Sequence, residues 1–150
     1  MVSEWEFQSE KGRDTPGPAR NERDDMPGFN TIAWFEIGTD DPAAAERFYG
    51  DLLGWTITTD AALAPDPAYR ILATGGGDGL RGGLFATGGE VPSYAVFSVL
   101  VEDVAETCRR AEEIGGTVLR GPHANPAGVT FAHLLDPDGN HFEVFKPPSL

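Results

Sequence analysis

The chain has 150 residues, of which 40% are apolar and 10% aromatic, and a formal net charge of −13 at pH 7. This length and composition suit one globular domain with a real core rather than a disordered chain. The acidity argues against nucleic acid and membrane surfaces as partners, because both attract a surplus of Lys and Arg. The single cysteine, Cys108, excludes an intrachain disulfide, and no apolar run is long enough to cross a bilayer.

The first 28 residues differ from the rest, with seven acidic residues, four basic residues and three prolines. They lack the basic and apolar regions of a secretory signal, so we expect a cytoplasmic protein. We predict a flexible tail over residues 1–28 and a single domain over residues 29–150.

Residues 31–38 are rich in β-branched and aromatic side chains and predict a strand. Asp40 or Asp41 can cap a helix that starts at Pro42 and stops at Gly54. Its apolar residues follow helical spacing, which predicts one buried stripe: Ala45, Phe48, Tyr49, Leu52 and Leu53. Three short strands are expected next, over residues 55–59, 68–74 and 80–87.

The second half of the chain has the same order of elements. We predict a strand over 93–101 and a helix over 102–114, capped near Glu102 or Asp103. Strands follow over 117–120, 128–135 and 140–145, and His123 lies in the Pro/Gly-rich loop "GPHANPAG" between the first two of them. Each half is therefore a β-α-β-β-β module, over residues 29–90 and 91–147.

An internal repeat supports this division. A shift of 62 residues places Phe35 on Phe97, Asp41 on Asp103 and Gly54 on Gly116, and no insertion is needed along the chain. The same shift pairs Arg81 with Glu143. Because the two modules are related by a pseudo-twofold, we expect these two side chains either to pair, or Arg81 to receive an anionic ligand group.

Two motifs carry a family resemblance: "ERFYGDLLGW" in the first helix and "DPDGNHFEVF" near the end. Together they resemble the vicinal oxygen chelate superfamily, which includes glyoxalase I, bleomycin resistance proteins and extradiol dioxygenases, over about residues 30–147. The resemblance implies an α+β fold in which two tandem modules form one cupped, mostly antiparallel sheet around a ligand. It also implies that a homodimer is a reasonable expectation.

The superfamily holds a metal with residues on the first and last strand of each module. Carried onto this sequence, these positions are Trp34, Val96, Arg81 and Glu143, and only Glu143 has a donor for a metal. We therefore expect no cofactor and no metal at the usual place. The alternative is a divalent metal held by Glu143 with His141 and His133.

Strand alternation selects the side chains that face the cup. Glu143 and Glu36 are the candidate catalytic groups, since a buried carboxyl can act as a general acid or base. The candidate ligand-binding residues are Trp34, Arg81, Tyr94, Val96, Ser98 and Phe145, with Phe85 as a further wall. Glu36 at the rim, exposed to water, remains the alternative for that residue.

These features predict a protein that binds a small, partly aromatic organic molecule in the cup, without the usual metal centre. Sequestration and metal-free turnover are both open. Two alternatives remain: a metal-dependent lyase, isomerase or dioxygenase that uses Glu143, and a non-catalytic interaction subunit whose cup is filled by its own side chains.

Overall fold

A computed structural model describes residues 28–76 and 79–148, and they form one eight-stranded sheet with two helices. The first module contains β1 (Thr31–Thr39), α1 (Pro42–Leu53), β2 (Thr56–Thr58), β3 (Tyr69–Ala73) and β4 (Arg81–Ala86). The second contains β5 (Tyr94–Leu100), α2 (Val104–Glu113), β6 (Thr117–Ala124), β7 (Thr130–Leu135) and β8 (His141–Lys146). The predicted α+β class and the two-module order are confirmed.

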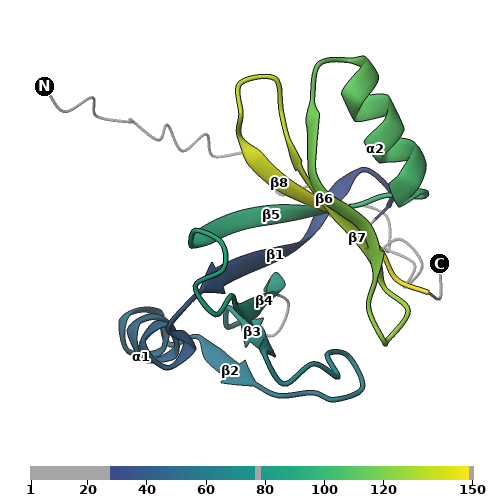
Figure 1. Ribbon diagram of the computed structural model, residues 1–150. Coiled ribbons are helices and arrows are strands. Elements are labelled where there is room, and N and C mark those ends of the chain that lie inside the picture. The colour runs from purple at the N-terminus through teal and green to yellow at the C-terminus, as the bar shows by residue number, and fades with distance from the viewer. Residues whose placement is uncertain (1–27, 77–78, 149–150) are drawn as a thin grey trace, which may run out of the picture.

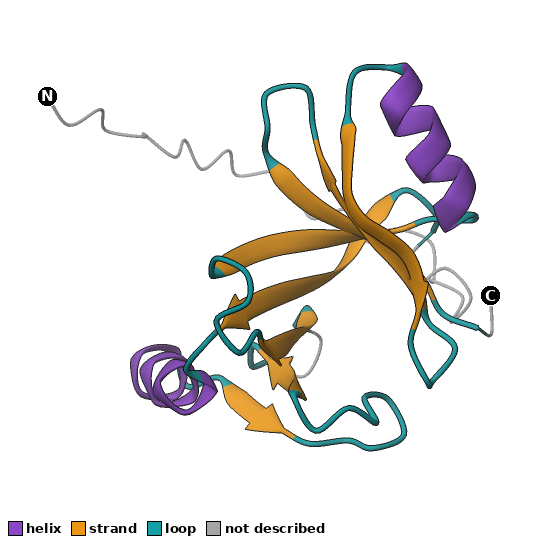
Figure 2. Cartoon of the chain, viewed as in Figure 1, coloured by secondary structure: helices purple, strands orange, loops and turns teal. Residues whose placement is uncertain are grey.

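The strand order is β2-β3-β4-β1-β5-β8-β7-β6, so each module contributes one half of the sheet. β1 and β5 pair antiparallel at the centre and join the modules, while β1 with β4 and β5 with β8 are parallel pairs. The sheet is strongly bent, and the two helices lie far apart near its two ends (Figure 1, Figure 2). This architecture places β1, β5 and β8 side by side under the cup.

Both helices begin where the sequence predicted. The Asp41 carboxylate accepts a hydrogen bond from the Ala44 amide at 3.0 Å, and Asp103 does the same for Glu106 at 3.0 Å. Gly54 ends α1 in the left-handed conformation at φ 69°, which glycine adopts without a steric cost.

The apolar stripe predicted for α1 is buried only in part. Ala45 and Tyr49 pack against the core of the first module, where Tyr49 stacks on Trp55 at 5.2 Å between ring centroids. Phe48 and Leu52 are exposed, with 58% and 64% of their surfaces accessible. The prediction of one buried stripe is wrong for these residues, because α1 packs against β2 and β4 near the edge of the sheet and leaves its outer flank open.

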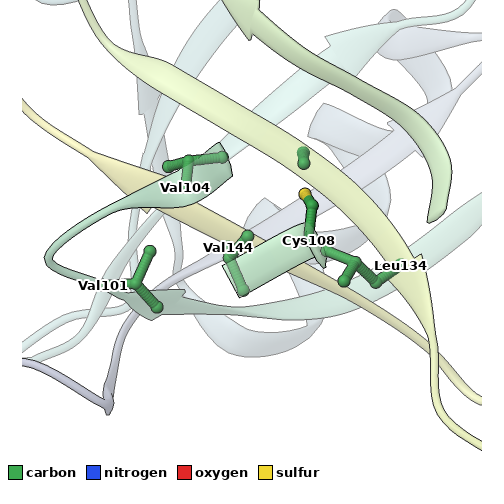
Figure 3. Close-up of a cluster of buried hydrophobic side chains, with 6 residues drawn as sticks. Val101, Val104, Cys108, Leu134 and Val144 are labelled. Atoms are coloured by element: carbon green, nitrogen blue, oxygen red, sulfur yellow. The ribbon is translucent and has the colours of Figure 1, made fainter. Parts of the chain in front are cut away.

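The second module has the tighter core. Val101, Val104 and Cys108 converge with Leu134 and Val144 between α2 and the strands β7 and β8 (Figure 3). Cys108 is buried in this cluster and behaves as a small apolar side chain. The packing fixes β7 and β8 firmly, and these strands carry two of the site residues described below.

β6 is longer than expected, because it runs on through Ala124. His123 therefore lies on a strand rather than in the predicted loop, with its ring 5.9 Å from that of Phe131. The register of β6 with β7 shifts twice, and this irregularity hides the strand from a simple pattern.

The tail predicted over residues 1–28 lies, except for Gly28, outside the described residues. No helix in the described ranges is long and apolar enough to cross a membrane.

Candidate functional site

A cavity of about 540 Å³ opens between the two modules on the concave side of the sheet. Its walls are mostly apolar and aromatic, and six rings line it: Trp34, Tyr69, Phe85, Tyr94, Phe131 and Phe145. β1, β3 and β4 supply three of these rings, and β5, β7 and β8 supply the others, so both modules build the cavity. A cavity of this size suits a small organic molecule.

Three buried polar side chains, Glu36, His133 and Glu143, line the same cavity. His133 Nε2 lies 3.2 Å from Glu143 Oε2 and 3.8 Å from Glu36 Oε2. Sheet register explains the meeting: Glu143 is directly opposite His133 across the β7–β8 pair, and β1 brings Glu36 from the centre of the sheet. We call these three residues the carboxylate–histidine cluster.

Each member of the cluster has a hydrogen-bond partner outside it. The Tyr94 hydroxyl donates to Glu36 Oε2 at 2.6 Å, and the Ser98 hydroxyl donates to Glu143 Oε1 at 2.7 Å. The other ring nitrogen of His133, Nδ1, lies 2.9 Å from Nε2 of His141. These contacts hold each side chain in one orientation.

Burial shifts the proton affinities of the cluster toward neutral forms. Desolvation raises the pKa of Glu143 to about 8, and the nearby Glu36 carboxylate adds to the shift. Desolvation also raises the pKa of Glu36, against the lowering effect of the Tyr94 hydrogen bond. The pKa of His133 falls to about 4, chiefly by desolvation. Near neutral pH the cluster therefore contains a neutral imidazole and at least one protonated carboxyl group.

Tyr69 and Gly83 form a second notable contact of the cavity wall. The Trp34 indole donates a hydrogen bond to the Tyr69 hydroxyl at 2.9 Å. That hydroxyl occupies the space where a β-carbon on Gly83 would stand, so any larger residue there would displace the ring. Burial and the negative charge of Glu36 raise the pKa of Tyr69, which remains a neutral phenol.

The structure places the predicted site residues unequally. Trp34, Glu36, Tyr94, Glu143 and Phe145, together with Phe85, line the cavity as their strand positions suggested. Val96 and Ser98 are buried on the same face of β5 but do not line the cavity; Ser98 acts on Glu143 instead. Sequence parity left the face of His133 open, and the structure turns it toward Glu143.

The predicted pairing of Arg81 with Glu143 is wrong. Glu36 is opposite Gly83 in the β1–β4 pair, and Ser98, the repeat partner of Glu36, is opposite Glu143 in the β5–β8 pair. The shift is therefore 60 residues at the last strand, because the β3–β4 connection is two residues longer than the β7–β8 connection. Gly83 is the true counterpart of Glu143. Arg81 is exposed at the start of β4 and makes no ion pair in the described part of the chain.

Sequence reasoning missed Arg120, the one Lys or Arg among the described residues that line the cavity. Arg120 lies opposite His133 in the irregular β6–β7 pair, and that irregularity concealed its face. Tyr69 and Phe131 were also missed as wall residues. The repeat aligned them with each other, and this shared aromatic position was the available signal.

The positions that hold a metal in the resembling family do not fit one here. Trp34 and Val96 have no donor, and neither the exposed Arg81 nor Gly83, its corrected counterpart, supplies one. The chemistry of the carboxylate–histidine cluster does fit a metal, since one ligand atom from each of Glu36, His133 and Glu143 lies within 4.8 Å of the others. Of the alternative set Glu143, His141 and His133, the first and last are in this cluster, and His141 contacts the far side of the His133 ring.

Comparison with known families decides where the chain belongs. The model of the Glyoxalase/Bleomycin resistance protein/Dioxygenase superfamily matches residues 31–144. The chain belongs to this superfamily. Its residues 31–144 include all of both helices and every strand except the last two residues of β8.

Named relatives agree with the superfamily. The chain is 32% identical over 117 residues to CFP32 of Mycobacterium tuberculosis, whose name places it among the glyoxylases; the match covers 78% of this chain and 44% of the relative. It is 38% identical over 126 residues to the anthracycline biosynthesis protein DnrV of Streptomyces peucetius, covering 81% and 42%. The chain thus spans less than half the length of these relatives.

A solved structure of a superfamily member from Vibrio splendidus shares the fold. It superposes with a TM-score of 0.51 at 19% identity, covering 75% of this chain and 95% of that one. At this identity the likeness concerns the arrangement of strands and helices alone.

Proposed function

We propose that the protein binds a small, partly aromatic and oxygen-bearing organic molecule in the cavity between its modules. The observation that carries this proposal is the cavity itself: about 540 Å³, six aromatic rings in its walls, and a few buried polar groups at fixed positions. Specific small-molecule sites combine an apolar surface with a small number of oriented polar groups in this way.

The aromatic walls favour a planar ligand. Rings from both modules line the cavity, so a flat molecule between them gains contact on two sides. Offset or edge-to-face contacts between rings stabilise a complex by about 0.5–1.5 kcal/mol each beyond the burial of area. Trp34 and Tyr69 are already fixed to each other by a hydrogen bond, so little ordering is needed when a ligand binds.

The polar groups favour oxygen functions on that ligand. A protonated carboxyl of Glu36 or Glu143 can donate a hydrogen bond to a carbonyl or hydroxyl oxygen, as a carboxyl kept neutral by burial does in other sites. Arg120 supplies a permanent positive charge beside the cluster for an anionic substituent. The same carboxyls could move a proton to or from the ligand, which leaves metal-free turnover within the scope of the site.

The name of one relative points to the same class of molecule. DnrV is named for anthracycline biosynthesis, and an anthracycline is a fused-ring aromatic compound with several oxygen substituents. The alternative of an interaction subunit with a filled cup receives no support, because the cup contains a cavity large enough for a ligand.

Calorimetric titration with anthraquinone-2-carboxylate tests the proposal, because this compound combines fused rings, carbonyl oxygens and a carboxylate. We expect saturable binding of one molecule per chain, and no measurable binding of cyclohexanecarboxylate, which has the charge without the rings. Arg120→Ala should weaken binding by about tenfold to a hundredfold, the range for a hydrogen bond to a charged group.

Arg81→Ala is the matched control, since Arg81 lies outside the cavity lining. It should leave the affinity unchanged. Equal loss in both variants would show attraction by surface charge rather than binding in the cavity. Failure of every oxygenated aromatic tested, with the protein folded, would refute the proposal.

A further inference from the structure

The carboxylate–histidine cluster combines three metal-ligand side chains from three different strands. Glu36 comes from β1, His133 from β7 and Glu143 from β8, and all three are buried, with 5–7% of their surfaces accessible. Their ligand atoms converge within 4.8 Å. Only Glu143 occupies a position that the superfamily uses for its metal, so the set is displaced from the usual one.

The charges of the cluster lack a fixed cation. Two carboxylates are buried side by side, and no Lys or Arg nitrogen of the described residues lies within 4.0 Å of either one. Arg120 lines the cavity nearby but forms no such pair, and the only nitrogen in reach belongs to His133. Buried carboxylates are normally paired with a cation, hydrogen-bonded in neutral form or bound to a metal.

The spacing suits an ion between the donors. A first-row divalent ion binds carboxylate oxygen and imidazole nitrogen at about 2.0–2.2 Å, which puts neighbouring donors about 3.0–3.4 Å apart in octahedral or tetrahedral geometry. The 3.2 Å separation of His133 Nε2 from Glu143 Oε2 lies in this range. The 3.8 Å separation from Glu36 Oε2 needs only a small movement of one carboxylate.

The partners around the cluster match those of metal ligands. Tyr94 orients Glu36 and Ser98 orients Glu143, and each bond leaves oxygen lone pairs free. His141 contacts Nδ1 of His133, which leaves Nε2 directed at the carboxylates. A histidine that binds a metal commonly uses its second nitrogen in such a supporting hydrogen bond.

We propose that Glu36, His133 and Glu143 bind one divalent first-row transition ion, at a site displaced from the superfamily's usual position. One nitrogen and two carboxylate donors suit Mn²⁺, Fe²⁺, Co²⁺ or Zn²⁺, and three protein ligands leave coordination positions open toward the cavity. The inference deepens the proposed function, because an ion there would face the oxygen groups of a bound molecule.

Cobalt titration of the full chain tests this site. The protein is produced without a histidine tag, treated with EDTA and dialysed free of chelator. Co²⁺ is then added and followed by calorimetry and by its visible absorption bands. We expect one equivalent per chain, with Glu36→Gln and His133→Gln each weakening the site at least about a hundredfold. Glu90→Gln, at an exposed carboxylate, is the control and should bind as the wild type does.

Circular dichroism of each metal-free variant establishes that it is folded. If Glu36→Gln fails to fold, His133→Gln gives the same comparison, and His141→Ala should weaken binding about tenfold to a hundredfold through loss of a supporting contact. Absence of a stoichiometric cobalt site in the wild type would overturn the inference. Binding unchanged in the folded ligand variants would overturn it as well, since it would show adventitious attachment to surface carboxylates.

The two proposals fail in different ways. Binding of anthraquinone-2-carboxylate in EDTA, without a cobalt site, would refute the metal and keep the ligand. A cobalt site with no binding of aromatic molecules in either metal-free or cobalt-loaded protein would do the reverse.

Discussion

Glu143 should make the stability of the protein depend on pH in a direction opposite to that of most carboxylates. Its pKa rises from 4.5 to about 8 on folding, so the folded state retains a proton that the unfolded chain has released. Its contribution to stability is complete below pH 4.5 and is lost as the pH rises toward and through 8. His133 acts in the other direction, because its pKa falls from 6.5 to about 4, but only between those two values. The interval from pH 6.5 to 8 therefore isolates the carboxyl groups.

The size of the effect follows from the shift. One proton difference changes the free energy of unfolding by about 1.4 kcal/mol per pH unit, and the difference shrinks as pH approaches 8. The wild type should lose between about 1.5 and 2 kcal/mol of unfolding free energy from pH 6.5 to 8 on account of this pair. Glu143→Gln resembles the protonated carboxyl in shape, so it should match the wild type near pH 6.5 and exceed it at pH 8. Some slope remains from Glu36, whose pKa is also raised, and the double variant with Glu36→Gln should remove it.

Urea unfolding at constant ionic strength, in EDTA and at four pH values across this interval, measures the effect. The midpoints of wild type, single variant and double variant are compared after a check that their m-values agree. A wild-type stability that rises from pH 6.5 to 8 would refute the assignment of a shared proton. An equal slope in all three proteins would place the titrating group elsewhere.

Three further substitutions test the fold around the site, each by denaturant unfolding. Gly83→Ala should destabilise the protein by about 1–3 kcal/mol, because its new methyl group overlaps the Tyr69 hydroxyl, and an unchanged stability would contradict the contact. Gly50→Ala, inside α1 with only an ordinary contact at 3.6 Å, should instead stabilise it by about 0.5–1 kcal/mol; a loss would show crowding that the structure lacks. Asp103→Ala should cost about 1 kcal/mol through loss of the α2 cap, and a cost near zero would mean that Glu106 finds another acceptor.

Local chemistry made the order of elements predictable. Asp41, Asp103 and Gly54 each act through hydrogen bonds or backbone angles within their own turn, so the sequence around them is sufficient. Alternation along β1 and β5 correctly selected the cup-facing side chains for the same reason. The repeat then indicated that both halves share one plan.

The errors occurred where distant segments decide the outcome. A connection two residues longer before β4 moved the counterpart of Glu143 from Arg81 to Gly83, and a constant shift could not show it. The irregular pairing of β6 concealed Arg120. His133 joined the cluster through its position opposite Glu143 in the sheet, which depends on the hairpin register rather than on either residue alone.

Binding of an aromatic molecule in the cavity is the central claim, and the tryptophan side chains report on it directly. Trp34 lines the cavity with its indole N–H bonded to Tyr69, whereas Trp55 stacks on Tyr49 in the core beneath α1. Their indole N–H signals can be separated in an ¹H–¹⁵N correlation spectrum and assigned with Trp34→Phe and Trp55→Phe. Titration with anthraquinone-2-carboxylate should shift the Trp34 signal saturably and leave the Trp55 signal in place. A spectrum in which the Trp34 signal stays fixed while the compound binds would contradict the claim.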